Sequence, residues 1–229
     1  GGRMAAAMNT EKAAGEGARL PNTVVEKPFV YGSAAIALKK EEIGEGQHTH
    51  RWTVYLRGLE NEDLSSYIEK VSFHLHESFA DPVRDISVPP YEVTETGWGE
   101  FRIMIKVTFR DPKEQPVSVY HQLKLFATNK AEQVAVGDPV MSEMYDEFIF
   151  HNPTQKFKDL LAKKPEKKFT DHFLMSHFET KGFIDKEQDH ISKLTSANKQ
   201  VQERMDQLRQ RLYVLDEEIM QLEKIARQS

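Results

Sequence analysis

Apolar and polar residues alternate along the middle of the chain in a pattern that is typical of β-strands. The cleanest run extends from Phe101 to Phe109, where an apolar side chain occupies every second position. Successive side chains of a strand point to opposite faces, so such a run predicts a half-buried strand. Similar but less regular alternation occurs at 52–57, 67–77, 117–126 and 144–150. A weaker run at 24–31 contains Pro28, which lacks a backbone donor, and it is predicted to be an edge strand.

Proline-containing turns separate these runs, and no helical pattern lies between them. Asp81-Pro82, Pro89-Pro90 and Asp111-Pro112 stop regular structure and favour turns or extended connections. About six short strands joined in this way predict an all-β fold, an antiparallel β-sandwich. After the last strand, Phe157, Leu160 and Leu161 recur at helical spacing, which predicts a short helix that packs on the sandwich.

The C-terminal region has a seven-residue repeat. Apolar residues, with Asn198 as the exception, occupy the a positions Ile191, Asn198, Met205, Leu212, Ile219 and Ala226 and the d positions Leu194, Val201, Leu208, Leu215 and Leu222. A strict a/d stripe over about five heptads predicts an α-helical coiled coil. A helix docked on the chain's own sandwich would need a wider apolar stripe. Asparagine at an a position favours one defined pairing.

The partner of this helix is left open by its charges. In a parallel homodimer Arg211 would meet Asp216, which is attractive. Two other pairs, Arg204 with Arg209 and Glu218 with Glu223, would repel each other. The sequence therefore allows a homodimer or a different partner helix.

These patterns divide the chain into four parts. Residues 1–20 lack periodicity and are predicted to be a disordered tail, and 21–162 form the sandwich domain. Residues 163–183 are predicted to be a linker, in which K-K-P-E-K-K is a weak candidate for a nuclear-localisation signal. Residues 184–229 form the coiled coil.

Composition excludes several classes of function. The chain has 229 residues and a net charge of -5, so it gives no reason to expect sequence-independent DNA binding. The absence of cysteine excludes disulfides and thiolate chemistry, which suits an intracellular protein. No run of about 18 apolar residues and no apolar leader occurs, so neither a membrane span nor a signal peptide is expected.

A small pocket is suggested by T-E-T-G-W-G-E-F, where Trp98 lies between Gly97 and Gly99. The glycines would allow positive φ or a close approach of the backbone. Trp98 could be a core residue, but the nearby Phe101, together with Ser78 and Phe79 at the end of an earlier strand, favours a pocket lined by aromatic rings.

Histidine pairs at 48/50 and 74/76 raise the alternative of a metalloenzyme. No carboxylate lies at a conventional ligand spacing and no H-E-x-x-H occurs, so we expect no metal and no cofactor. Ser78 lacks the G-x-S-x-G setting of a hydrolase nucleophile, and no glycine loop for phosphate is present. We therefore expect that the protein is not an enzyme.

Four spaced motifs resemble a known family. W-T-V-Y-L-R-G, V-S-F-H-L-H-E-S-F, P-P-Y-E-V-T-E-T-G-W-G-E-F and H-N-P-T are similar to the YEATS domain, an acyl-lysine reader of chromatin proteins. The coiled coil makes the whole chain resemble the short branch of the family. This resemblance implies an immunoglobulin-like sandwich and a nuclear protein. Its partners would be an acylated histone H3 tail and, through 184–229, subunits of a histone-variant remodeller or histone acetyltransferase complex, without direct sequence-specific DNA binding.

The resemblance also implies a binding site. Its members would be His48, His76, Ser78, Phe79, Gly97, Trp98, Gly99 and Phe101. Phe79 and Trp98 would sandwich the acyl-amide, the hydroxyl of Ser78 would bond to it, and the backbone N–H of Trp98 would donate to the acyl oxygen. The alternative is a scaffold that binds histones or subunits and whose pocket is incidental.

Overall fold

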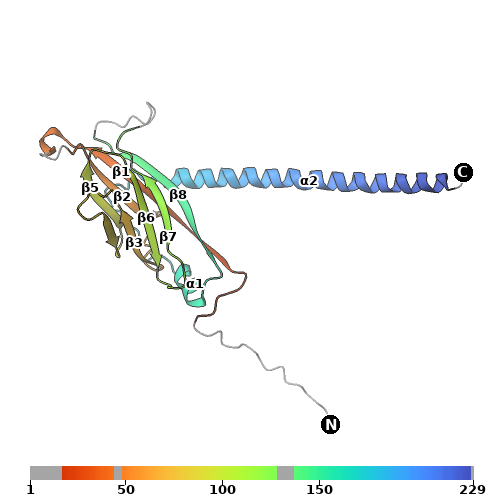
Figure 1. Ribbon diagram of the computed structural model, residues 1–229, viewed down its shortest axis with the longest axis horizontal. Coiled ribbons are helices and arrows are strands. Elements are labelled where there is room, and N and C mark those ends of the chain that lie inside the picture. Colours follow the sequence, from red (N-terminus) through yellow and green to blue (C-terminus); the bar gives the residue numbers. More distant parts are fainter. Residues whose placement is uncertain (1–16, 44–47, 128–136, 228–229) are drawn as a thin grey trace, which may run out of the picture. The chain divides into compact units, whose positions relative to one another are not determined.

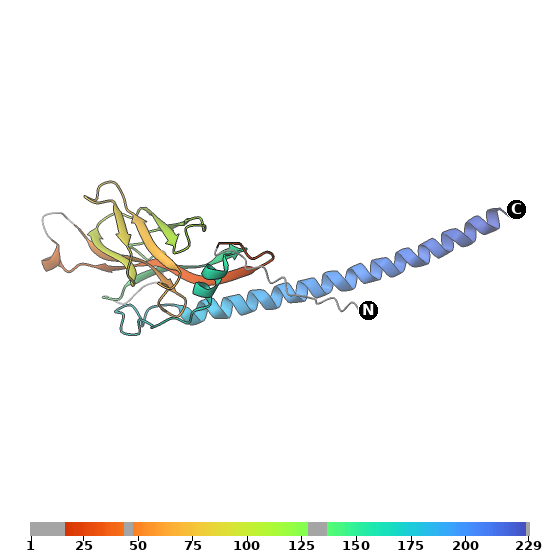
Figure 2. The same ribbon diagram turned by 90° about the horizontal axis from the view of Figure 1, so that it is seen from below.

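The computed structural model describes residues 17–43, 48–127 and 137–227, and the chain forms two compact units that divide between Phe178 and Glu179. In the first unit, the described residues form eight strands in two antiparallel sheets, which Figure 1 shows as a sandwich and Figure 2 from a second direction. One sheet has the order β5-β2-β1-β8, with the bounds Tyr91–Gly97, His50–Gly58, Val24–Ala37 and Val140–His151. The other has the order β4-β3-β6-β7, with the bounds Val83–Ile86, Ile68–His74, Arg102–Phe109 and Val117–Gln122. The predicted antiparallel sandwich is therefore confirmed, and its architecture is immunoglobulin-like.

The core lies between the two sheets and follows the alternation in the sequence. In β6, Ile103, Ile105, Val107 and Phe109 are buried, whereas the residues between them face outward. Trp52 and Phe73 contribute the largest buried side chains of β2 and β3. Burial of a large apolar side chain stabilises a fold by about 1.5–3 kcal/mol, so these rows hold the sheets together.

The prediction that 24–31 is an edge strand is wrong. Strand β1 extends to Ala37 and lies between β2 and β8. Pro28 is tolerated because β2 pairs with β1 only from Phe29 onward, so at Pro28 the strand has a neighbour in β8 alone.

Strands β4 and β5 were not predicted. Strand β4 has four residues, and none of them is fully buried. In β5, only Tyr91 and Val93 are buried, and the polar T-E-T that follows carries no apolar alternation. The sequence signal is weak because neither strand places more than two side chains in the core.

Helix α1, Gln155–Ala162, forms where the spacing of Phe157, Leu160 and Leu161 predicts it. The hydroxyl of Thr154 caps the helix by accepting the backbone N–H of Phe157 at 3.2 Å. Phe157 and Leu161 are buried, and the helix covers the end of the sandwich where β1 begins (Figure 1).

The residues that follow α1 pack on the sandwich and do not form a free linker up to residue 183. Leu174 is only 1% exposed and contacts Ala34 and Tyr55 on the outer face of the β1-containing sheet. The guanidinium of Arg57 lies over the ring of Phe178 at 4.3 Å. The linker prediction failed here because the apolar residues of 163–178 have no helical or strand period.

The N-terminal boundary also differs from the prediction. Residues 1–16 of the predicted tail lie outside the described residues. Arg19, however, forms a bridge with Thr154, and its guanidinium donates to the carboxylate of Glu114 at 3.0 Å. The part of the chain that contacts the sandwich therefore includes Arg19, which precedes the predicted boundary at residue 21.

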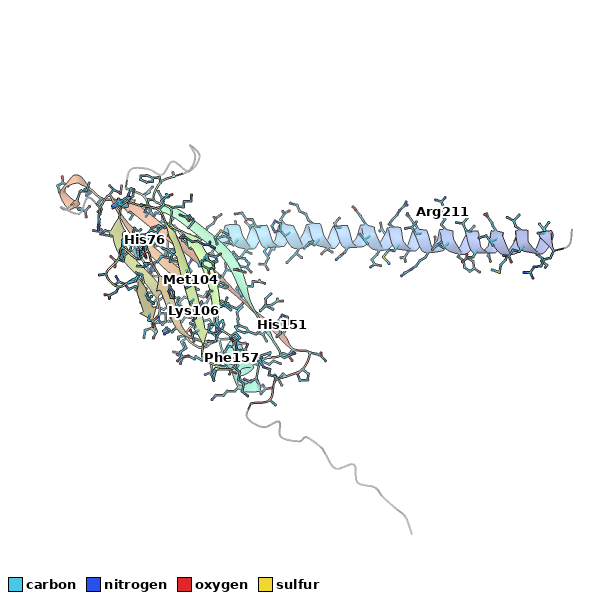
Figure 3. All side chains as sticks on the ribbon, in the orientation of Figure 1. His76, Met104, Lys106, His151, Phe157 and Arg211 are labelled. Atoms are coloured by element: carbon cyan, nitrogen blue, oxygen red, sulfur yellow. The ribbon has the colours of Figure 1, made fainter. Side chains whose placement is uncertain are left out.

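The second unit contains helix α2, Thr180–Ala226, with Arg211 marked in Figure 3. This confirms that a helix spans the heptad region. No residue of α2 is buried, and its a and d side chains are exposed. No helix in the described part of the chain combines the length and the apolar character that a membrane crossing requires.

Candidate functional site

An open cavity of about 500 Å³ lies at the end of the sandwich opposite α1. The connections β1–β2, β3–β4 and β5–β6 form its walls. Its lining residues are His48, His76, Ser78, Phe79, Ala80, Glu95, Thr96, Gly97, Trp98, Gly99, Glu100 and Phe101. The structure thus brings all eight predicted site residues together at one place.

Pairing between β2 and β5 positions the glycine-flanked loop. His50 lies opposite Gly97 in the register, and the backbone N–H of Thr49 donates to the carbonyl of Gly97 at 3.1 Å. Next to this pair, His48 Nδ1 and Thr96 Oγ1 are 2.6 Å apart. The side chain of His48 is therefore fixed beside the entrance to the Gly97–Gly99 loop.

His76 and Ser78 form a compact polar group. The backbone N–H of Ser78 donates to Nδ1 of His76 at 3.2 Å, and Ser78 Oγ lies 3.0 Å from the same nitrogen. Because Nδ1 accepts the backbone N–H, it carries no proton, and the hydroxyl of Ser78 can donate to it. The lone pairs of Ser78 Oγ are then available to accept a hydrogen bond from a ligand.

Aromatic rings form the floor of the cavity. The ring centroids of Phe79 and Phe101 are 5.8 Å apart, and His76 lies 5.9 Å from Phe101. Trp52 lies beneath and contacts Phe79 and Phe101 edge to face, at 5.8 and 5.7 Å. Since Trp52 is fully buried, it anchors both phenylalanines to the core.

Trp98 behaves differently from these rings. Its side chain is 68% exposed although it lines the cavity, so it is not a core residue. An exposed indole has apolar area that is still in contact with water, and a flat ligand could cover it.

The two glycines beside Trp98 have different roles. Neither takes a positive φ, so that reason for glycine is wrong at both positions. A Cβ at Gly97 would lie 3.3 Å from Nε1 of Trp52, which is a tight approach. A Cβ at Gly99 would meet nothing within 4 Å. Gly97 therefore permits close packing, whereas Gly99 has no steric need to be glycine.

The charged groups of the cavity wall are held by neighbouring residues. Glu95 pairs with Arg84 at 3.0 Å, and Glu100 accepts the backbone N–H of Leu125 at 2.8 Å. Burial lowers the pKa of His50, which lies behind the wall, and this outweighs the opposite effect of Glu100. The lowered pKa favours the neutral form of His50.

Sequence reasoning missed several residues of the site. Four missed residues lie within two positions of a predicted site residue in the sequence, and this nearness could have indicated them: Ala80, Glu95, Thr96 and Glu100. Trp52 could not be found in this way, because the alternation of apolar and polar residues at 52–57 indicates only that Trp52 belongs to the core.

Only one histidine of each pair lines the cavity, His48 from the first and His76 from the second. His74 lies in β3, whereas His76 lies beyond the end of that strand and lines the cavity. Among residues 17–43, 48–127 and 137–227, no group of three or more His, Asp or Glu side chains is placed to hold a metal ion.

The chain is similar to known proteins over most of its length. The family model "YEATS family" matches residues 47–127, which include all eight predicted site residues. The Protein AF-9 homolog of Eremothecium gossypii is 36% identical over 201 residues, which cover 85% of this chain and 94% of the relative. The chain belongs to the YEATS family. The Protein AF-9 homolog of Saccharomyces cerevisiae is 33% identical over 212 residues, 85% of this chain and 92% of that protein.

Solved structures of YEATS domains agree with the fold. The Yaf9 YEATS domain bound to acetylated histone H3 is 39% identical, with a TM-score of 0.56 over 65% of this chain and all of that chain. A second Yaf9 YEATS structure, which recognises a succinylated histone H3 peptide, is 40% identical with a TM-score of 0.55 and covers 65% of this chain and 100% of its own. All twelve lining residues of the cavity fall within the matched YEATS region.

Proposed function

We propose that this YEATS protein is a nuclear chromatin reader that binds acylated lysine on histone H3 tails. The observation that carries the proposal is the cavity at the sandwich end, where an aromatic floor, an exposed indole and the Ser78 hydroxyl surround one opening. The similar Yaf9 YEATS domains, which bind acylated histone H3, support it.

The chemistry of the cavity suits an acyl-amide. Acylation removes the charge of lysine and creates a planar amide, which can stack between Phe79 and Trp98. Ser78 Oγ would accept the amide N–H, and the backbone N–H of Trp98 would donate to the acyl oxygen. Free lysine has a charged ammonium group, which would lose solvation against the aromatic floor.

A titration series tests this function and separates it from a scaffold with an incidental pocket. Histone H3 peptides that differ only in one lysine, unmodified, acetylated, butyrylated or crotonylated, are titrated calorimetrically. We expect no measurable affinity for the unmodified peptide and crotonyl binding a few-fold tighter than butyryl. Butyryl and crotonyl have the same number of carbon atoms, so they bury similar apolar area. Stacking of the flat crotonyl group adds about 0.5 kcal/mol or more to its binding free energy.

Two results would contradict the proposal or a part of it. Equal affinity for modified and unmodified peptides would favour the scaffold. Crotonyl binding no tighter than butyryl would disprove stacking on both faces of the ligand, while leaving acyl recognition intact.

Replacing Ser78 with alanine is expected to weaken acyl-lysine binding about fivefold. The variant loses one hydrogen bond to the ligand, and such a bond contributes about 1 kcal/mol. Ser118→Ala on the exposed face of β7 is the matched control and should keep full affinity. Affinity that is unchanged in Ser78→Ala would remove this hydroxyl from the site.

We further propose that residues 184–229 form a coiled coil through the a and d positions of α2. Their exposed apolar side chains would otherwise remain in water. Through this coiled coil the chain would join a histone-variant remodeller or histone acetyltransferase complex, or would pair with a second copy.

A further inference from the structure

Lysines are concentrated in one part of the sandwich unit. Residues 151–170 contain six lysines but only two acidic residues, although the whole chain has a net charge of -5. Four of the lysines belong to K-K-P-E-K-K, and Lys156 and Lys158 lie on α1. The charge of the whole chain therefore conceals a strongly basic segment.

The structure gathers these lysines with cations from another part of the chain. A concave surface of about 530 Å³ is lined by three cations, two serines and two acidic residues: Arg110, Lys163, Lys164, Ser65, Ser66, Asp63 and Glu166. An adjacent one of about 200 Å³ shares Arg110 and adds Lys113 and Lys156. We call Arg110, Lys113, Lys156, Lys163 and Lys164 the basic end. All five are exposed.

Two carboxylates near the basic end, those of Asp63 and Asp111, are engaged by other groups. Asp63 accepts the backbone N–H of Ser65 at 2.8 Å, and Asp111 accepts the hydroxyl of Thr154 at 2.6 Å. Within the described parts of the chain, no ion pair engages Lys156, Lys163 or Lys164. These ammonium groups remain available to an anionic ligand.

Arg110 is held in place from one side. Its Nε donates to the carbonyl of Ser65 at 2.6 Å, and its backbone N–H donates to the carbonyl of Tyr67 at 2.9 Å. A guanidinium has five N–H donors, so the bond from Nε orients the group and leaves donors for a ligand.

The lysine motif is folded, which argues against reading it as a linear signal. The backbone N–H of Asp63 donates to the carbonyl of Lys167 at 2.9 Å, and that of Phe169 donates to the carbonyl of Asn61 at 3.0 Å. Lys168 pairs with Glu60. A segment whose backbone groups already form hydrogen bonds within the domain cannot be bound by a receptor as a free extended peptide. Lys163 and Lys164 therefore act from a fixed surface.

The basic end lies away from the acyl-lysine cavity. Figure 3 marks His76 at one end of the sandwich and Phe157 of α1 at the other. Both sites belong to the same compact unit, so one domain can hold two ligands without competition between them.

We propose that the basic end binds the phosphate backbone of DNA without sequence preference, while the cavity holds an acyl-lysine of a histone tail. Lysine, arginine and serine are side chains that contact phosphate, and contacts of this kind carry no sequence information. The choice of DNA rests on the proposed function, because DNA wraps the histone core from which the tails emerge.

The salt dependence of such binding can be calculated. If about four phosphates are neutralised, the slope of log K against log salt concentration is about -3.6. Affinity then falls about 150-fold between 50 and 200 mM salt. Each lysine removed should lower the magnitude of the slope by about 1.

The test uses the full chain, a fluorescent 30-base-pair duplex and anisotropy at several salt concentrations. Lys163→Glu/Lys164→Glu should weaken DNA binding at least tenfold at 50 mM salt and reduce the slope by about 2. The matched control, Lys70→Glu/Lys106→Glu, makes the same change of net charge on strands β3 and β6 and should bind nearly as the unaltered chain does. Affinity for acetylated peptide should be unchanged in both variants.

Three outcomes would overturn the assignment. The first is that the unaltered chain does not bind DNA, and the second is that both double variants lose DNA affinity equally. The third is that polyglutamate binds as tightly as the duplex, which would indicate an acidic protein partner. The proposed reader function is tested separately. If acyl preference is absent but DNA binding still depends on Lys163 and Lys164, the reader function fails and the phosphate site stands.

Discussion

Replacing Trp98 with alanine is expected to abolish binding of acylated histone H3 peptides while the sandwich remains folded. The indole is 68% exposed, so its removal leaves the core rows intact. It would, however, remove one of the two aromatic faces between which the acyl-amide stacks. The site would keep Phe79 and Phe101 on one side only.

The second tryptophan of the chain supplies the control. Trp52 is 1% exposed, and Trp52→Ala should destabilise the domain by about 3–5 kcal/mol. Calorimetric titration and thermal unfolding of both variants separate the two roles. If Trp98→Ala loses its cooperative unfolding transition, Trp98 supports the core and the expectation fails.

Replacing Leu208 and Leu215 with glutamate is expected to abolish self-association of the chain or its association with a partner helix. Both residues lie at d positions and are exposed along α2. Charges at two successive d positions would be buried without partners in any coiled coil. Light scattering of the full chain measures self-association. Co-purification of a helical partner protein with the full chain measures association with a different helix.

The control for this change is Gln200→Glu/Gln210→Glu, which adds the same charge outside the a/d stripe and should leave association intact. Peptide affinity of the cavity should be the same in both variants. A full chain that is monomeric and recovers no helical partner would contradict the coiled coil.

The fold could be predicted where burial imposes a period on the sequence. Strand β6 was predicted because four of its side chains are buried in alternation. The segment around Leu174 could not be predicted, because one deeply buried residue between the exposed Phe173 and the half-buried Met175 has no period. Its position depends on contacts with residues far away in the chain, such as Arg57 with Phe178.

Most of the site could be predicted because its residues lie in two short stretches, 76–79 and 97–101, at the ends of β3 and β5. Aromatic and hydroxyl side chains at the ends of two strands predict a pocket from the sequence alone. The support from Trp52 could not be predicted, since edge-to-face contacts of a strand residue with Phe79 and Phe101 in two connections leave no mark in the sequence. The roles of the site residues in binding remain predictions.

The contrast between the two tryptophans gives the protein an intrinsic optical reporter. One indole is sealed in the core and the other faces water at the rim of the cavity. A soluble fluorescence quencher cannot reach the buried ring of Trp52, whereas it can reach the ring of Trp98 and quench its fluorescence. A ligand that stacks on Trp98 would shield this ring as well, so occupancy of the cavity could be followed by light alone, without a label on protein or peptide.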